Sequence, residues 1–251
     1  MKLLMAANWK MYKNRAEAAA FLRDLTKRLD PMPEDREIAV FAPFTALGAC
    51  ADAMDGGTRI RLGGQDCWTA EQGAFTGEIS PAMLSDCGCS LVLTGHSERR
   101  AVLGESNTLV GAKTTFALAS GLDVILCVGE TLEQRELGAL DAVISRQLEE
   151  GLAGVPDNVA PERMSVAYEP VWAIGTGKTA GSEEIVAAHA LVRQRLADRF
   201  GGAGGAKMRI LYGGSVKPEN AAQIISLDNV DGLLIGGASL LVESFARIVT
   251  A

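Results

Sequence analysis

The sequence has little positive charge: 24 lysine and arginine residues stand against 31 aspartate and glutamate residues, for a net charge of -7. A nucleic-acid-binding protein needs a basic surface, so this composition excludes nucleic acid as a partner. Long apolar runs are also absent. Trp9 and Lys10 break the N-terminal run, which leaves it too short for a signal peptide or a membrane span. We therefore expect a cytoplasmic protein that binds neither nucleic acid nor membrane.

A paired set of cysteines is lacking as well. The five cysteines, an odd number, are Cys50, Cys67, Cys87, Cys89 and Cys127. Cys87 and Cys89 flank a single glycine, a spacing that allows a metal site, but no second pair or suitably spaced histidine completes a tetrahedral set of ligands. We expect no metal ion, and thiols that stay reduced in the cytosol.

No linker, low-complexity stretch or change of composition divides the 251 residues. Short apolar runs rich in valine, isoleucine and leucine begin at residues 3, 38, 60, 90, 123, 164, 209 and 232. Their lack of strict alternation is typical of parallel strands buried on both faces. Helical patterns lie between them, as at 14–29, 140–150 and 182–200. The sequence predicts an α/β fold, a single-domain (β/α)8 barrel over residues 1–251, with an open doubly wound sheet as the alternative.

Residues 167–184, AYEPVWAIGTGKTAGSEE, raise the question of nucleotide binding, because Gly177, Lys178 and Thr179 form the tripeptide that ends many phosphate loops. Such a loop needs another glycine five residues before Gly177, where the backbone wraps the phosphates. Trp172 occupies that position, and an indole cannot replace glycine there. A dinucleotide-binding motif must follow its strand directly, whereas PVWAI intervenes here. Both nucleotide interpretations are therefore disfavoured.

The loop 170–180 has instead the composition of a lid. Pro170 stiffens its start, and four apolar residues follow: Val171, Trp172, Ala173 and Ile174. An apolar tip in water is unfavourable unless the loop closes over a site, and such closure expels water from that site. A static packed loop is the alternative.

Polar residues follow several of the predicted strands: Asn8 and Lys10 the first, His96 the fourth and Glu169 the sixth. In a barrel these positions converge on one face. Closure of the neighbouring lid would desolvate the Glu169 carboxylate and make it a stronger base. The helix predicted to start after His96 disfavours protonation of that imidazole. We expect a neutral His96 that donates a hydrogen bond to a carbonyl group, while His189, in mid-helix, is expected to be structural.

Glycine pairs follow the last two predicted strands, at Gly213 and Gly214 and at Gly236 and Gly237. Glycine allows close backbone approach, and successive amides can bind an anion. Phosphate sites of (β/α)8 barrels lie after these strands. The pattern predicts a phosphate monoester ligand, with Lys10 as the full positive charge; simple tight turns are the alternative.

Several segments together resemble the triosephosphate isomerase family. They are NWK at 8–10, GAFTGEIS at 73–80, GHSERR at 95–100, AYEPVWAIGTGKTA at 167–180, YGGSV at 212–216 and GGASL at 236–240. Their order and spacing cover essentially the whole chain. The resemblance implies a TIM barrel that interconverts dihydroxyacetone phosphate and D-glyceraldehyde 3-phosphate without a cofactor or metal.

The resemblance also implies a catalytic role for each matching residue. Glu169 matches the base that moves the proton, and His96 matches the electrophile that polarises the substrate oxygens. Lys10 matches the cation, Asn8 its polar neighbour, and Glu98 a carboxylate close to that lysine.

Substrate and subunit contacts follow from the same resemblance. The positions matching those that grip the phosphate are Gly175, Ser215, Gly236 and Gly237. Segment 73–80 matches a loop that enters a pocket of a second subunit, with Phe75 and Thr76 as dimer contacts. A homodimer is therefore implied. Tyr12 and Asp66 depart from residues common in the family, which leaves the detail and strength of the dimer contact open.

Two rival functions remain open at this point. An isomerase of the same fold could act on a larger phosphorylated ketose, such as a tetrulose phosphate, and pocket size would distinguish the two substrates. A barrel that binds a phosphate ligand without catalysis is the other rival. It is disfavoured because pure binding gives no reason for Glu169.

Overall fold

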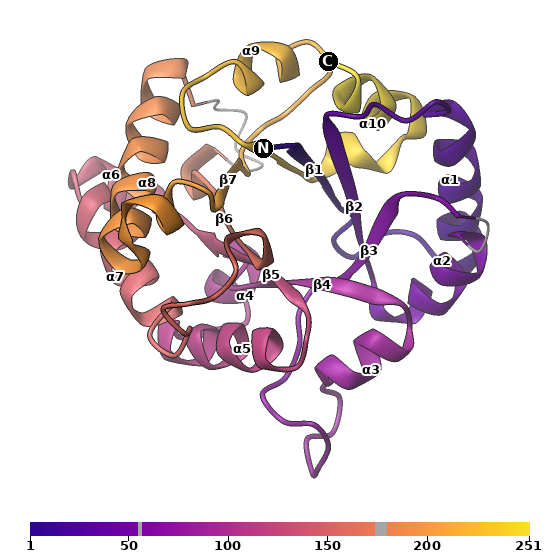
Figure 1. Ribbon diagram of the computed structural model, residues 1–251, viewed down its shortest axis with the longest axis horizontal. Helices are drawn as coiled ribbons and strands as arrows, with labels where there is room; N and C mark the ends of the chain where they lie inside the picture. Colours follow the sequence, from indigo (N-terminus) through magenta and orange to yellow (C-terminus); the bar gives the residue numbers. More distant parts are fainter. Residues whose placement is uncertain (55–56, 174–179) are drawn as a thin grey trace.

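The computed structural model describes residues 1–54, 57–173 and 180–251. Within these residues, eight parallel strands follow one another around a closed barrel, and β1 pairs with both β2 and β8. Helices surround the barrel on its outside (Figure 1). The predicted (β/α)8 barrel is confirmed, and the open-sheet alternative is wrong.

Each predicted apolar run forms a strand. The strands are β1 (Leu3–Asn8), β2 (Arg36–Ala42), β3 (Ile60–Gly64), β4 (Cys89–Thr94), β5 (Asp123–Val128), β6 (Met164–Tyr168), β7 (Arg209–Tyr212) and β8 (Gly232–Ile235). The α-helices are α1 (Arg15–Arg28), α2 (Leu47–Met54), α3 (Pro81–Asp86), α4 (Ser97–Ala101), α5 (Asn107–Ala119), α6 (Leu132–Glu136), α7 (Leu140–Gly151), α8 (Ser182–Gly205), α9 (Ala221–Ile225) and α10 (Val242–Val249). Short 3-10 turns are η1 (Phe44–Ala46), η2 (Pro161–Arg163), η3 (Val171–Ala173) and η4 (Gly237–Leu240).

Two separate apolar layers bury both faces of the strands. Alternate strand residues such as Leu4, Ala6 and Phe41 form a small cluster made of strand residues, which fills the barrel. Their neighbours pack outward against the helices in a much larger cluster. Phe41 fits because β3 has glycine opposite it: a Cβ on Gly63 would lie 2.4 Å from the Phe41 ring. This double burial explains why the strands read as continuous apolar runs.

Helix α1 shows how the local sequence sets a boundary. The Asn14 side chain accepts a hydrogen bond from the Glu17 amide, and the Glu17 carboxylate accepts one from the Asn14 amide. This reciprocal cap satisfies two amides that the first helical turn leaves free. The apolar face of α1, including Phe21 and Leu22, is buried against the barrel.

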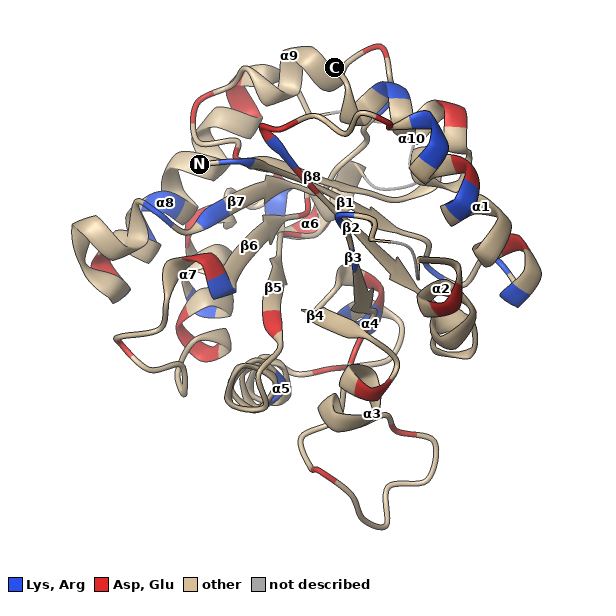
Figure 2. Ribbon diagram, turned by 45° about the vertical axis from the view of Figure 1, so that its right-hand side comes forward, with Lys and Arg blue, Asp and Glu red and all other residues tan. Residues whose placement is uncertain are grey.

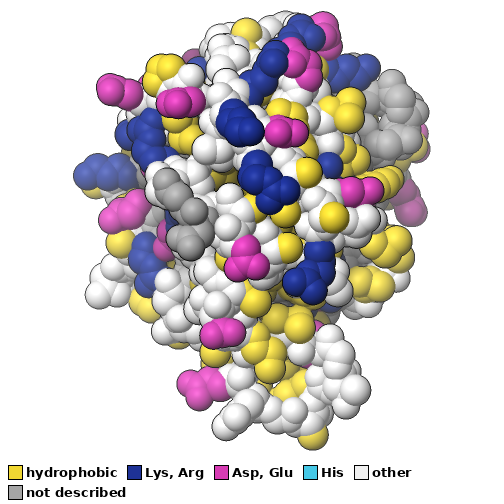
Figure 3. Space-filling model, turned by 90° about the vertical axis from the view of Figure 1, so that its right-hand side faces the viewer, with side chains coloured by type: hydrophobic (Ala, Val, Ile, Leu, Met, Phe, Trp, Pro, Cys, Tyr) yellow, Lys and Arg dark blue, Asp and Glu magenta, His cyan; other side chains and the backbone are white. Residues whose placement is uncertain are grey.

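Charged residues of both signs are distributed over the surrounding helices and loops (Figure 2). None of the described helices is long and apolar enough to cross a membrane. One segment departs from the rounded outline: the connection from β3 to α3, residues 65–80, projects away from the barrel (Figure 1). Figure 3 shows hydrophobic side chains gathered at the base of this projection.

Candidate active site

A cavity of about 650 Å³ lies at the carboxyl ends of the strands. Its walls come from the segments that follow β1, β4, β6, β7 and β8. The sequence-predicted residues that line it are Asn8, Lys10, His96, Glu98, Glu169, Ser215, Gly236 and Gly237. Gly175, predicted to bind phosphate, lies outside the described residues. The cavity therefore joins groups from both ends of the chain.

Lys10 reaches the cavity from a strained backbone. Its φ is 52°, a left-handed conformation that is uncommon for residues other than glycine. The peptide is held on both sides, because the Asn8 side chain accepts a hydrogen bond from the Lys10 amide and the Gln65 side chain donates one to the Lys10 carbonyl. The Lys10 ammonium lies 2.6 Å from the Glu98 carboxylate. Strain of this kind persists only where surrounding contacts hold it.

Glu169 follows β6 at a point where the neighbouring strands leave very little space. Its amide donates a hydrogen bond to the Val128 carbonyl at 2.7 Å. A Cβ on Gly129 would lie 1.7 Å from the Glu169 carbonyl oxygen, and a Cβ on Gly213 would lie 2.9 Å from Glu169 Cγ. Glycine at both positions is therefore required for the buried carboxylate, which is 2% exposed, to occupy this place.

His96 and Glu169 form a buried pair. His96 Nε2 lies 3.0 Å from Glu169 Oε1, and the Ser97 amide donates to Glu169 Oε2 at 2.8 Å. On the other side of the ring, His96 Nδ1 accepts a hydrogen bond from the Glu98 amide and caps α4. An accepting Nδ1 places the proton of a neutral ring on Nε2, where it faces the carboxylate.

The two members of this pair shift each other's pKa. Burial opposes the charge on His96, but the Glu169 carboxylate outweighs burial and raises the pKa of His96 above its ordinary value. This direction is opposite to the one expected from the helix dipole alone, because the dipole argument omitted the facing carboxylate. Burial would likewise raise the pKa of Glu169, yet His96, the Ser97 amide and Lys10 together lower it. These contacts favour the ionised form of the Glu169 carboxylate.

The segments after β7 and β8 form the opposite wall of the cavity. A Cβ on Gly236 would lie 3.1 Å from Lys10 Cε, so the backbone runs directly beside the lysine side chain. The Ser239 amide and hydroxyl both donate to the Gly236 carbonyl, at 2.8 and 2.7 Å, and fix the turn that begins η4. A backbone so close to an ammonium group is suited to an anionic ligand.

The start of the predicted lid is packed against neighbouring segments. Trp172 and Ala173 are buried, at 7% and 1% exposure. The Trp172 indole donates to Glu130 at 2.8 Å, and the Tyr168 hydroxyl donates to the same carboxylate. Glu130 lies after β5, 42 residues earlier in the chain, so a local reading of the loop could not find this partner. Residues 174–179 of the predicted lid lie outside the described part of the chain.

Three contributors to the site were missed from the sequence. Gln65 and Glu130 follow β3 and β5, so the rule that chemistry lies after the strands could have found both. The Ser97 amide carries no side-chain signal. Its role is visible only because α4 begins beside Glu169.

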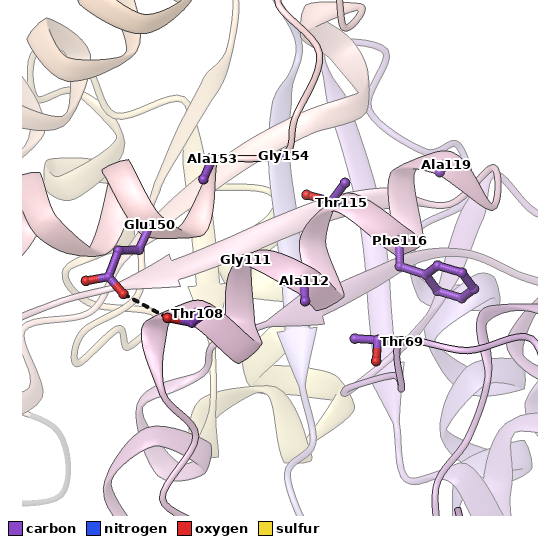
Figure 4. A pocket seen from close by; sticks show the side chains of 10 residues that line it. All are labelled: Thr69, Thr108, Gly111, Ala112, Thr115, Phe116, Ala119, Glu150, Ala153 and Gly154. Carbon is purple, nitrogen blue, oxygen red and sulfur yellow. Dashed lines mark hydrogen bonds between the residues drawn. The ribbon is translucent and has the colours of Figure 1, made fainter. Parts of the chain in front are cut away.

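A second cavity, of about 680 Å³, lies between α5 and α7 (Figure 4). Its lining is mostly threonine, alanine and glycine, with Glu150 as the ionisable group, accepting a hydrogen bond from Thr108. No acid and base face each other there among the described residues. The strand-end cavity is therefore the candidate active site.

The predicted dimer contacts lie apart from this cavity, on the projecting loop 65–80. Phe75 is 44% exposed, and its ring lies 5.5 Å from that of Trp68. Thr76 is exposed as well. Among the described residues, no cluster of three or more histidine, cysteine or acidic side chains could hold a metal ion.

The fold and the buried carboxylate–imidazole pair define an enzyme of the (β/α)8 barrel class with groups suited to proton transfer. The family model described as triosephosphate isomerase matches residues 3–251. A triosephosphate isomerase from Nitratidesulfovibrio vulgaris strain Miyazaki F is 63% identical over 254 residues, and one from Oleidesulfovibrio alaskensis is 58% identical over 251 residues, each match covering the whole of both chains. The crystal structure of triosephosphate isomerase from Bartonella henselae has a TM-score of 0.88 and 41% identity, covering 99% of this chain and 98% of the other. The chain belongs to the triosephosphate isomerase family.

Proposed function

We propose that this isomerase interconverts dihydroxyacetone phosphate and D-glyceraldehyde 3-phosphate, with Glu169 as the base. The observation that carries the proposal is the buried pair of His96 and Glu169, 3.0 Å apart in the cavity that Lys10 also lines. A carboxylate can remove a proton from a carbon next to a carbonyl group only if the developing oxygen anion is stabilised. His96 and Lys10 are placed on the same cavity to do so.

The proposed reaction moves one proton between adjacent carbons. Glu169 takes the proton from C1 of dihydroxyacetone phosphate, the C–H electron pair forms a C1=C2 bond, and O2 takes the negative charge. A proton then passes from O1 to O2, beside His96 Nε2. Glu169 returns its proton to C2, which gives the aldehyde at C1. Each atom is retained, so the reaction needs no redox partner.

In this structure the Glu169 carboxylate faces His96 and Ser97, so it has to move before it can act as the base. Its carboxylate accepts hydrogen bonds from His96 Nε2 and the Ser97 amide, so it must leave both before it can face a substrate carbon. His96 Nε2–H is then free to donate to the substrate oxygen. Loss of two partners also removes much of what lowers the pKa of Glu169, which makes the released carboxylate a stronger base.

Substrate phosphate is assigned in this proposal to Gly175, Ser215, Gly236 and Gly237. Support comes from the three described members, which line the cavity beside Lys10. Closure of loop 170–180 over the phosphate would exclude water from the enediolate and so favour its reprotonation. The proposal also includes a cytoplasmic homodimer with Phe75 and Thr76 as contacts, supported by the exposed phenyl ring on a projecting loop.

Steady-state kinetics of three variants test the proposal. Glu169→Gln removes the base and should lower kcat about 10³-fold or more. Glu169→Asp displaces the carboxylate by one methylene group and should lower kcat about 10²-fold, while binding of inorganic phosphate stays within about twofold. Glu162→Gln is the matched control, since Glu162 is exposed just before the opposite end of the same strand.

The substrate is tested in the same assay with a phosphorylated tetrulose. If the tetrulose phosphate is turned over faster than the triose phosphate, the assignment of Glu169 as the base stands but the assigned substrate is wrong. Full activity of Glu169→Gln would reject the assignment of the base. Equal loss of phosphate binding and turnover in Glu169→Asp would also count against it.

A further inference from the structure

Lys13 combines a strained backbone with a semi-buried ammonium group outside the cavity. Its φ is 74°, in the left-handed region where a lysine is uncommon. Lys10, with a φ of 52°, lies three residues earlier in the same loop. Such strain persists where the surrounding structure holds it, and it is frequent at ligand-binding segments. The contacts of the Lys13 side chain therefore hold this strained loop in place.

The Lys13 ammonium joins the two ends of the chain. It donates a hydrogen bond of 2.9 Å to the carbonyl of Leu240, which is 227 residues later in the sequence. Leu240 is the last residue of η4, and η4 begins at Gly237 in the wall of the active-site cavity. The bond therefore connects the loop after β1 with the segment after β8.

Two aromatic rings, those of Trp9 and Phe21, lie beside this ammonium group. Lys13 Nζ lies 4.6 Å from the centre of the Phe21 ring and 5.4 Å from that of Trp9. The two rings meet edge to face, 5.0 Å apart, and both are buried. A cation over aromatic rings is attracted by their electron-rich faces. Partial burial lowers the pKa of Lys13, while Glu17 opposes that shift, so the ammonium is partly withdrawn from water.

We propose that Lys13 is a positioning residue for the phosphate-binding segment: its ammonium holds η4, and with it the amides of Gly236 and Gly237, against the loop that carries Lys10. The inference rests on the proposed function, which assigns the substrate phosphate to these glycines. The close approach of Gly236 to Lys10 Cε makes the spacing sensitive, because a displaced η4 changes the distance between the amides and the Lys10 ammonium.

The kinetic signature follows from what the phosphate does in the reaction. Because the phosphate group does not react and Lys13 lies outside the cavity, we expect loss of the Lys13 ammonium to weaken binding of the substrate and of the transition state equally. Loss of uniform binding raises KM and leaves kcat nearly unchanged. A fault in the proton-transfer groups would instead lower kcat.

Four variants and two ligands test the inference. Lys13→Met keeps most of the apolar stem and removes the ammonium, whereas Lys13→Arg keeps a charged donor. Lys207→Met is the control for charge, because Lys207 is exposed just beyond the C-terminal end of α8. For Lys13→Met we expect about a fivefold rise in KM for D-glyceraldehyde 3-phosphate and in the inhibition constant of inorganic phosphate, with kcat within about twofold. Lys13→Arg should lie closer to the wild type, and Lys207→Met should match it.

Lys13→Gly separates positioning from folding. Glycine adopts a φ of 74° without strain, so this variant should melt no lower than Lys13→Met and yet show the same rise in KM. Unchanged KM and phosphate inhibition in Lys13→Met, or a fall in kcat at constant KM, would overturn the inference. Failure of inorganic phosphate to inhibit the wild type would overturn the proposed phosphate site as well, which distinguishes the two failures.

Discussion

His189 occupies a position where the fold opposes protonation of an imidazole. Its Nδ1 lies 2.9 Å from the Asn229 carbonyl, which identifies Nδ1 as the protonated nitrogen, and its Nε2 is buried with no hydrogen-bond partner among the described residues. Its ring packs near those of Tyr168 and Tyr212. Burial lowers the pKa of His189 to about 4. The structural role expected for this mid-helix residue fits these contacts.

The low pKa of His189 predicts a loss of stability in acid. In the unfolded chain His189 binds a proton below a pH of about 6.5, whereas in the folded chain it stays neutral until about pH 4. His189 therefore costs no stability above about pH 6.5. As the pH drops towards 4, its buried neutral ring lowers the free energy of unfolding by about 3 kcal/mol. His189→Asn keeps a donor near Asn229 and does not titrate. Urea unfolding at pH 7, 6 and 5, at one protein concentration, should show a flatter dependence for this variant; parallel curves would contradict the assignment.

Residues of the site were predictable where one rule covered them. Asn8, His96 and Glu169 each follow an apolar run directly, so the barrel geometry alone placed them on one face. Lys13 escaped the same rule because its partner, Leu240, offers only a backbone carbonyl 227 residues away. Every residue has a backbone carbonyl, so the sequence does not indicate which one a lysine will contact.

At the scale of elements, an ion cluster ties the projecting loop to the barrel wall. Lys113 of α5 is fully buried, bonded to Asp66 at the start of the loop and to Glu105 before α5. Arg99 of α4 contacts the same two carboxylates, at 2.9 Å for Asp66 and 2.6 Å for Glu105. Burial raises the pKa of Asp66 to about 6 although Lys113 opposes this shift. The projecting loop, α4, the segment before α5 and α5 itself thus share one desolvated network.

Removal of the central cation should destabilise the fold. Lys113→Met leaves two buried carboxylates with Arg99 as their remaining partner, and we expect the free energy of unfolding to fall by about 3 to 5 kcal/mol. The double variant Lys113→Met with Asp66→Asn removes one of those charges and should recover part of the loss. Denaturant unfolding at neutral pH measures both, with Lys207→Met as the control. A double variant less stable than the single one would contradict this account of the cluster.

The lid marks the limit of sequence reasoning about an element. Its apolar composition predicted that Trp172 would be buried against something, but not which residue it would contact. The indole has an apolar body and one N–H donor, and a buried carboxylate on a neighbouring segment satisfies that donor. Periodicity within eleven residues carries no information about Glu130.

For the whole molecule, the closed barrel was the most predictable feature, because eight buried strands alternating with helices have few other ways to pack. The proposed homodimer assigns its subunit contact to the projecting loop. In the proposed homodimer, Phe75→Asp places a charge on a ring that is 44% exposed, and the dimer dissociation constant should rise at least about tenfold. Sedimentation at several concentrations measures this change.

Leu137→Asp is the matched control for the dimer prediction, since Leu137 is 75% exposed at the end of α6. It should leave the dissociation constant unchanged. A wild type that sediments as a monomer at all concentrations would reject the homodimer, and equal effects of both variants would reject the assignment to loop 65–80.

The pairing of β1 with β8 also affects how the protein is made. A ribosome makes β1 and Lys10 seven strands before β8 and Gly236, yet in the completed cavity a Cβ on Gly236 would lie 3.1 Å from Lys10 Cε. A growing chain therefore carries the proposed base Glu169 and its partner His96 before the segment after β8, to which we assign the substrate phosphate, has been made. A chain interrupted before β8 lacks the wall of the cavity that contains Gly236 and Gly237, so we expect such a fragment to be inert.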